Sequence, residues 1–199
     1  MTKYNFHFDR EPHETTKAHA RREQEGFFKN YCQGLGIDIG CGFDPVDPGG
    51  EVYMFDMIHG QGDATLMENV DDEQFDYVHT SHILEHIEDA ETAIKNWWRI
   101  LKPGGYLIIM VPERDLYEKK RTLPSNWNGD HKRFYLLDFH DPPHTVGLVH
   151  WLGQQLAPLG AGMNYKVLSA RTLQEEPDSP PEVHSGGEYS IEVVVRKLK

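Results

Sequence analysis

The chain has 199 residues, of which 38% are hydrophobic, and it carries a formal net charge of −12. This size and composition suit one soluble domain over residues 1–199. The negative charge disfavours nucleic acid as a partner, because such binding depends on Lys and Arg that neutralise phosphates. No apolar signal region or bilayer-length segment is present, so we expect a cytoplasmic protein with no membrane partner. Without an export signal, Cys32 and Cys41 are expected to remain free thiols.

The first predicted element is a helix over residues 12–31, where Ala, Arg, Glu, Gln and Lys predominate and helix breakers are few. A short apolar strand over 35–39 follows and leads into Gly40, Cys41 and Gly42. Glycines at the end of a strand let the backbone approach a ligand closely, since no Cβ blocks the approach. The turn therefore predicts contact with a flat or bulky ligand.

The second predicted strand, 52–56, ends in Asp56, whose carboxylate can accept hydrogen bonds from the two hydroxyls of a ribose. A nucleoside ligand is the leading hypothesis. The phosphate-binding pattern G-x-G-x-x-G is incomplete, because its third glycine is missing and two aspartates and two prolines follow Gly42. These features argue against a dinucleotide and favour a ligand with positive or no charge near the turn.

Further strands are predicted over 75–80 and 105–111, and the apolar spacing between them predicts a helix over 88–101. Strands that alternate with helices imply a parallel sheet with right-handed crossovers. Segment 113–144 is predicted to face the substrate, because sites in open α/β sheets are built from segments at the strand carboxyl ends. The elements predicted for the rest of the chain are a helix over 145–157, two antiparallel strands over 165–170 and 189–195, and a solvated loop over 174–188.

Five motifs occur in order between residues 35 and 112. They lie at 38–42, 56, 62–64, 80–87 and 101–105. In this order they resemble the class I S-adenosylmethionine-dependent methyltransferase superfamily. The short segments after the first two strands, together with residues 129–135, resemble its compact bacterial, type 11-like subgroup. The resemblance implies an α/β Rossmann-like three-layer sandwich, in which a mostly parallel seven-stranded sheet has an antiparallel last strand and the helices after strands 1 and 2 are shortened.

The resemblance also implies S-adenosyl-L-methionine as the cofactor. The positions that match cofactor-binding positions of the superfamily are Asp38, Gly40, Cys41, Gly42, Asp56, Met57, Asp63, Ala64, Ser81 and His82. Within the single domain, we expect an N-terminal helical cover over 1–34, a cofactor-binding half over 35–112, the substrate-facing insertion over 113–144, and a helix and strand pair over 145–199.

The expected activity is methyl transfer to a hydroxyl or amine of a small molecule or sugar. Two alternatives stay open: a peptide or protein methyltransferase, and a non-catalytic cofactor-binding interaction protein. A homodimer is also compatible with the sequence.

Histidines supply the candidate catalytic groups, since their ordinary pKa suits a general base for a hydroxyl or ammonium acceptor. Asp130 and His131 form the first candidate acid–base pair, and His82 is expected to lie, with residues 129–135, nearer the acceptor. Arg133 and Tyr135 are candidates for substrate binding, or they anchor the insertion against the sheet. His82 and the histidine four residues later have the spacing of a two-histidine metal site. Because the surrounding motif resembles metal-independent superfamily members, no metal is expected.

Overall fold

The computed structural model describes residues 13–160, 164–175, 180, 182–184 and 186–198. Its central sheet has six strands in the order β2-β1-β3-β4-β8-β7. The strands are β1 (Gly36–Ile39), β2 (Val52–Phe55), β3 (Phe75–Ser81), β4 (Leu101–Pro112), β7 (Tyr165–Thr172) and β8 (Ser190–Lys197). The first four strands run parallel, and β8 runs antiparallel to both β4 and β7. The expected Rossmann-like fold class with an antiparallel last strand is confirmed.

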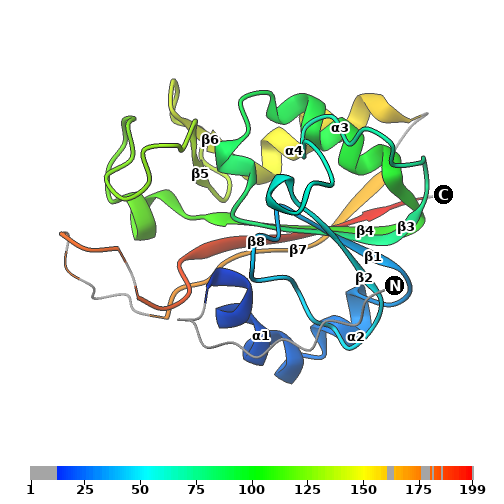
Figure 1. The fold of residues 1–199 in the computed structure, drawn as a ribbon. Coiled ribbons are helices and arrows are strands. Elements are labelled where there is room, and N and C mark those ends of the chain that lie inside the picture. Colours follow the sequence, from blue (N-terminus) through cyan, green and yellow to red (C-terminus); the bar gives the residue numbers. More distant parts are fainter. Residues whose placement is uncertain (1–12, 161–163, 176–179, 181, 185, 199) are drawn as a thin grey trace.

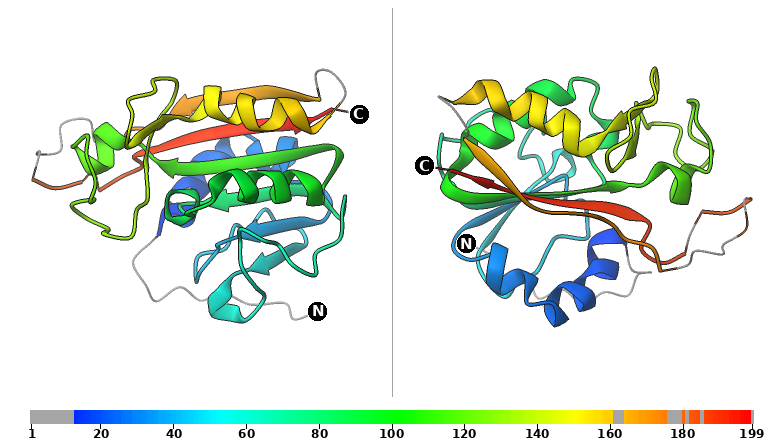
Figure 2. Two further views of the ribbon diagram at one scale, coloured as in Figure 1. Left: turned by 90° about the horizontal axis from the view of Figure 1, so that it is seen from above. Right: turned by 180° about the vertical axis from the view of Figure 1, so that it is seen from behind.

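Helices cover both faces of this sheet, which gives three layers (Figure 1). On one face lie α1 (Glu14–Gln24) and α2 (Phe27–Tyr31), and on the other lie α3 (Ala90–Ile100) and α4 (Leu148–Leu156). Seen from above, α3 lies over β3 and β4, whereas α4 lies over the β7–β8 edge (Figure 2).

The amphipathic helix α3 illustrates how sequence produces this packing. Its side chains Ala93, Ile94, Trp97 and Trp98 are buried at the spacing of one helix face. Asp89 caps the helix, because its carboxylate accepts a hydrogen bond from the backbone N–H of Thr92 at 3.0 Å.

The helices after the first two strands are short, as expected. Residues 40–51 contain turns only, and a single 3-10 turn, η1 (Met57–His59), follows β2. The described sheet has six strands rather than seven, because the chain from residue 60 to 74 makes turns in place of a further strand and the sheet ends at β2.

Two predicted helices were too long. The helix over 12–31 is divided by Gly26, which adopts a left-handed conformation at φ 67° and separates α1 from α2. The first three residues of the helix predicted over 145–157 form β6 (Thr145–Gly147), which pairs with β5 (Phe134–Leu136) in a second, two-stranded sheet. Residues 1–12 of the predicted helical cover and parts of the loop predicted over 174–188 lie outside the described residues.

The insertion over 113–144 lies at the carboxyl ends of the central strands (Figure 1). It begins with a π-helical turn (Arg114–Glu118) directly after β4, and it contains β5. The backbone N–H of Lys132 donates to the carbonyl of Glu85 at 2.8 Å. This bond ties the insertion to the 3-10 helix η2 (Leu84–His86), which follows β3.

None of the helices in the described ranges is long and apolar enough to cross a membrane.

Candidate active site

A cavity of about 350 Å³ lies where β1, β2 and β3 end. Its size falls within the range of small-molecule sites, about 300–1,000 Å³. Its lining residues are Gly40, Asp56, Met57, Gly62, Asp63, Ala64, Thr65, Ile83, His86, Ile87 and Glu88. Carboxyl ends of parallel strands are where open α/β sheets bind their ligands. All the lining residues lie between 40 and 88, so the described part of the expected N-terminal cover, residues 13–34, contributes none of them.

The turn after β1 requires glycine at position 40. Gly40 has φ 70°, a left-handed conformation, and its N–H donates to the carbonyl of Phe55 at 2.8 Å. A Cβ at this position would lie 2.6 Å from Cγ1 of Ile83. The absence of a side chain therefore lets the β1 turn, the end of β2 and the segment after β3 approach one another around the cavity.

Asp56 organises the same turn and retains capacity for a ligand. Its carboxylate accepts one hydrogen bond from the backbone N–H of Gly42 and one from that of Ile58, both at 2.9 Å. An ionised carboxylate offers about four acceptor positions, so two bonds leave about two further positions. That remainder matches the two hydroxyls of a ribose.

The turn over residues 63–65 is held by α3. The indole N–H of Trp97 donates to the carbonyl of Ala64 at 2.8 Å, and the side-chain amide of Asn96 donates to the carbonyl of Thr65 at 2.9 Å. Trp97 is wholly buried. A side chain that the sequence indicates only as core thus also fixes one wall of the cavity.

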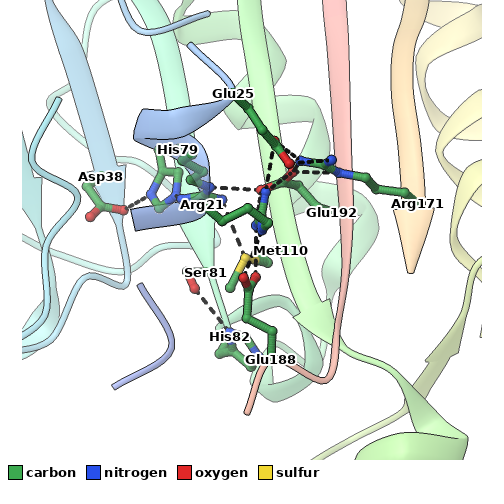
Figure 3. Close-up of polar contacts among 11 residues, drawn as sticks. Arg21, Glu25, Asp38, His79, Ser81, His82, Met110, Arg171, Glu188 and Glu192 are labelled. Carbon is green, nitrogen blue, oxygen red and sulfur yellow. Dashed lines mark hydrogen bonds and ion pairs between the residues drawn. The ribbon is translucent and has the colours of Figure 1, made fainter. Parts of the chain in front are cut away.

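Asp38 lies beneath the turn and does not line the cavity. It is fully buried, and its carboxylate accepts from the backbone N–H of Val46 at 2.7 Å. Its other oxygen lies 2.6 Å from Nδ1 of His79, its register partner on β3 (Figure 3). Nε2 of His79 lies 2.9 Å from the Arg22 guanidinium. Because a guanidinium only donates, Nε2 accepts and Nδ1 carries the proton that is donated to Asp38.

The chain of contacts continues to Glu192 on β8. Its carboxylate accepts from Arg22 of α1 at 2.8 Å, from Arg171 of β7 at 2.7 Å and from Arg21 at 3.2 Å (Figure 3). Burial raises the pKa of Glu192, but the charges of Arg22 and Arg21 and the hydrogen bonds from Arg171 and Arg21 outweigh it and lower the pKa to about 2. We call this set the arginine network; it comprises Arg21, Arg22, Asp38, His79, Arg171 and Glu192.

A second group of charged side chains lies where η2 meets the insertion. Nδ1 of His131 lies 2.5 Å from Oε1 of Glu118, and Nδ1 of His86 lies 3.2 Å from Oδ2 of Asp130. The rings of His86 and His131 have centroids 4.8 Å apart. The predicted pairing of Asp130 with His131 is wrong, because the two neighbouring side chains diverge to different partners.

Glu85 completes this group, which we call the histidine cluster and which comprises Glu85, His86, Glu118 and His131. One carboxylate oxygen of Glu85 lies 3.8 Å from Nε2 of His86, and burial raises the pKa of Glu85 to about 8. The other oxygen, Oε2, has no hydrogen-bond partner among the described residues, and the same holds for Oε2 of Glu118. Buried carboxylate oxygens without partners are costly, so each requires a reason.

His82 lies apart from the cluster. Its Nδ1 is 3.0 Å from the hydroxyl of Ser81 and its Nε2 is 3.1 Å from the hydroxyl of Ser190. Burial, followed by the positive charge of Lys17, lowers the pKa of His82 to about 3. At φ 52° its backbone breaks any helix, so His82 and His86 do not share a helix face.

Arg133 and Tyr135 occupy anchoring positions. The Arg133 guanidinium donates to the carbonyls of Ile87 and Glu88 at 2.9 and 2.6 Å, and Tyr135 is wholly buried. These contacts match the anchoring alternative of the sequence analysis.

Of the ten predicted cofactor residues, five line the cavity: Gly40, Asp56, Met57, Asp63 and Ala64. The other five, Asp38, Cys41, Gly42, Ser81 and His82, are not among its lining residues. Cys41 is buried, and burial raises the pKa of its thiol to about 12, so it stays uncharged at neutral pH.

Sequence reasoning did not assign roles to Glu85 and Glu118. Glu85 is adjacent to His86 in a motif that had been singled out, so a buried carboxylate there could have been suspected. Glu118 carries no local signal, because its contact with His131 spans 13 positions and depends on how the insertion folds.

Comparison with known proteins identifies the family of this chain. A family model described as a methyltransferase domain matches residues 24–170. The chain belongs to this methyltransferase family. Curated protein sequences contain no match to it.

Solved structures share the fold of this methyltransferase. A SAM-dependent methyltransferase from Archaeoglobus fulgidus superposes with a TM-score of 0.56 at 18% identity, covering 91% of this chain and 92% of its own. One from Aquifex aeolicus gives 0.52 at 14%, covering 92% of each chain. The 1,6-didemethyltoxoflavin-N1-methyltransferase of Burkholderia thailandensis gives 0.56 at 13%, covering 94% of this chain and 80% of its own.

The Burkholderia thailandensis structure holds S-adenosylhomocysteine, and the Archaeoglobus fulgidus and Aquifex aeolicus proteins are described as dependent on S-adenosylmethionine. Two features of the cavity fit S-adenosylmethionine independently of these comparisons. The side-chain-free Gly40 leaves room at the β1 turn, and Asp56 keeps two acceptor positions for ribose hydroxyls.

Proposed function

We propose that this methyltransferase transfers a methyl group to a hydroxyl or amine of a small molecule or sugar. The observation that carries the proposal is the position of His86, which both lines the cofactor cavity and belongs to the histidine cluster. The cluster lies under the insertion, where His131 is only 6% exposed. An enclosed acceptor site of this kind suits a compact molecule better than a peptide, which needs an exposed groove.

On the cofactor side, Asp56 would accept hydrogen bonds from the ribose hydroxyls, and Gly40 would allow the backbone to approach. Asp63 and Ala64 would border the adenine, on the turn that Trp97 holds. Asp38 would act as a positioning residue, since it fastens Val46 and hence the segment after the glycine turn. Bound S-adenosylmethionine would supply a sulfonium methyl group, which the acceptor's lone pair attacks while the sulfur–carbon electron pair stays on sulfur.

On the acceptor side, His131 would be the central catalytic residue. Its Nδ1 is fixed by Glu118, which leaves Nε2 as the ring nitrogen that can act on the acceptor. His82, with both nitrogens near serine hydroxyls and a strongly lowered pKa, would orient the cavity wall without taking up a proton at neutral pH. Asp130 would act through His86.

One neighbour supports a small acceptor. The Burkholderia thailandensis protein is described as an N1-methyltransferase of 1,6-didemethyltoxoflavin, and its likeness extends over 94% of this chain. The net charge of −12 is consistent with an acceptor that is not a nucleic acid.

Calorimetry of cofactor binding tests the first half of the proposal. Wild-type protein should bind S-adenosylhomocysteine, and Asp56→Ala should weaken binding about tenfold or more, because the ribose loses its acceptor. Asp72→Ala removes an exposed carboxylate outside the cavity and should leave the affinity unchanged. Equal affinity of Asp56→Ala and wild type would remove Asp56 from the site.

An acceptor screen tests the second half. Transfer of a labelled methyl group is measured against hydroxyl and amine compounds, sugars and a peptide library. Labelled small molecules are expected. Labelled peptides alone would replace the proposed substrate class, and cofactor binding without transfer to any acceptor would favour a non-catalytic protein.

A further inference from the structure

Three side chains able to bind a metal converge at the histidine cluster. Glu85, His86 and His131 each offer a ligand atom, and these atoms all lie within 4.8 Å of one another. Two of them come from η2, and the third comes from the insertion, 45 residues later. The backbone hydrogen bond from Lys132 to Glu85 holds the two segments in register at this point.

Both histidines have their second ring nitrogen held by a carboxylate. Glu118 lies at Nδ1 of His131 and Asp130 lies at Nδ1 of His86. This arrangement leaves Nε2 of each ring as the nitrogen available to a metal. Metal-binding histidines almost always have such an outer carboxylate or carbonyl, which fixes the tautomer and the orientation of the ring.

An independent observation points to a missing positive partner. Glu85 is 1% exposed, and its Oε2 has no hydrogen-bond partner among the described residues. In the arginine network, by contrast, Arg21, Arg22 and Arg171 donate to the buried Glu192. A cation between Glu85 and the two imidazoles would satisfy the unpaired oxygen.

We propose that Glu85, His86 and His131 bind one divalent transition-metal ion, such as zinc. Two imidazoles and one carboxylate suit zinc, cobalt or manganese better than magnesium or calcium, which prefer oxygen ligands alone. Ligand atoms around a tetrahedral zinc ion lie about 3.4 Å apart. The site therefore closes by side-chain movements of about 1 Å, which long Glu and His side chains make through small torsional changes.

The site also specifies the acceptor chemistry, a step that rests on the proposed function. Three protein ligands leave an open position on the ion, and His86 places that ion beside the cofactor cavity. An acceptor hydroxyl bound there would be held next to the methyl donor with a lowered pKa, and it would lose its proton to bulk water, because Nε2 of His131 is then bound to the ion and acts on the acceptor only through it. The inference therefore favours a hydroxyl acceptor over an amine.

Metal binding to the tag-free, chelator-treated full-length protein tests the proposal. Titration with zinc should give one ion per chain, and cobalt should give the visible absorption bands of a four- or five-coordinate site. Glu85→Gln and His131→Ala should each weaken binding about 100-fold or more, and Glu118→Gln about tenfold. His150→Ala, which removes an exposed histidine on α4, is the matched control and should bind like wild type.

Three results would overturn the proposal: no stoichiometric binding, equal binding by the Glu85→Gln, His131→Ala and His150→Ala variants, or binding of magnesium in preference to zinc. Circular dichroism and thermal melting establish that each variant is folded, and the isosteric Glu85→Gln provides the test if His131→Ala does not fold. The titrations contain no cofactor. Metal binding without S-adenosylhomocysteine binding would support the metal site and reject the proposed function. S-adenosylhomocysteine binding without metal binding would support the proposed function and reject the metal site.

Discussion

The arginine network and the histidine cluster differ in how many hydrogen-bond partners their buried carboxylates have. In the arginine network, Glu192 accepts hydrogen bonds from three arginines, and both oxygens of Asp38 have partners. In the histidine cluster, Glu85 and Glu118 each keep one buried oxygen without a partner among the described residues. Burial of a carboxylate is costly in both places, but only the network offsets that cost within the chain.

This difference indicates that the arginine network stabilises the fold, whereas the histidine cluster serves the chemistry of the site. The network joins α1 to β3 and β8 of the sheet, links β7 to β8, and ends at Asp38 beneath the glycine turn, so it holds the turn from below (Figure 3). The cluster adjoins the cavity through His86. The network pairs its buried carboxylates within the chain, whereas two carboxyl oxygens of the cluster have no partner among the described residues and lie near a cavity where a ligand can satisfy them.

Removal of Arg22 should produce the largest effect on stability. This side chain is wholly buried and contacts Glu192, His79 and the sulfur of Met110. Arg22→Met leaves Glu192 with less compensation and His79 without a donor. The free energy of unfolding, measured in urea, should fall by about 3–5 kcal/mol.

The control for this variant is Arg196→Met, which removes an exposed arginine from β8. Its unfolding free energy should stay within about 0.5 kcal/mol of wild type. If Arg22→Met were equally mild, the network would contribute little to stability and the contrast between the two regions would disappear.

Acid should remove the contribution of Glu192 to the stability of the fold. The folded-state pKa of Glu192, about 2, lies below the ordinary value of 4.5, so its contribution is complete above about pH 4.5 and is lost as the pH falls toward 2. The shift corresponds to on the order of 3 kcal/mol. Unfolding free energies of wild type and Glu192→Gln, compared between pH 6 and 3, should converge at low pH. Parallel curves would show that Glu192 is not the group that titrates.

Much of the fold could be predicted from local sequence. The strand that runs into Gly40, Asp56 at the end of β2 and the amphipathic spacing of α3 each depend on short-range patterns. The break at Gly26 and the strand β6 were missed for different reasons. Gly26 is a local signal of a helix end that the helix-forming composition of 12–31 outweighed, whereas β6 exists only where β5 lies beside it.

The site was predictable in part for the same reason. Asp56 and Asp63 follow apolar strands or turns directly, and both line the cavity. The partner of His131 was not predictable, because Asp130 is adjacent in sequence but Glu118 is adjacent in space. The role of Asp38 was obscured as well, since its contact with His79 is fixed by the register between β1 and β3, and its contact with Val46 by the path of the segment after Gly42.

Removal of His131 should lower turnover without weakening cofactor binding. With an acceptor in hand, His131→Ala should lower kcat about 100-fold, because the acceptor loses the group that activates it. S-adenosylhomocysteine affinity should be unchanged, because His131 is not among the cavity-lining residues. The exposed His150→Ala provides the baseline. Normal turnover in His131→Ala would reject its catalytic role, and loss of cofactor binding would indicate a structural one.

The most direct comparison of the two regions makes the same substitution, Glu to Gln, in each of them. The smallest change in stability is expected at Glu85. Glu85→Gln and Glu192→Gln make the same substitution at two carboxyl groups that are each at most 1% exposed. At Glu192 the change leaves three arginines without their anion, and the unfolding free energy at pH 7 should fall by about 3 kcal/mol. At Glu85, where burial raises the pKa and favours the uncharged carboxyl group, the substitution removes little charge at pH 7, and stability should stay within about 1 kcal/mol of wild type. Urea denaturation of both variants makes the comparison; equal losses would mean that Glu85 is a structural charge like Glu192, and that its unpaired oxygen has no functional reason.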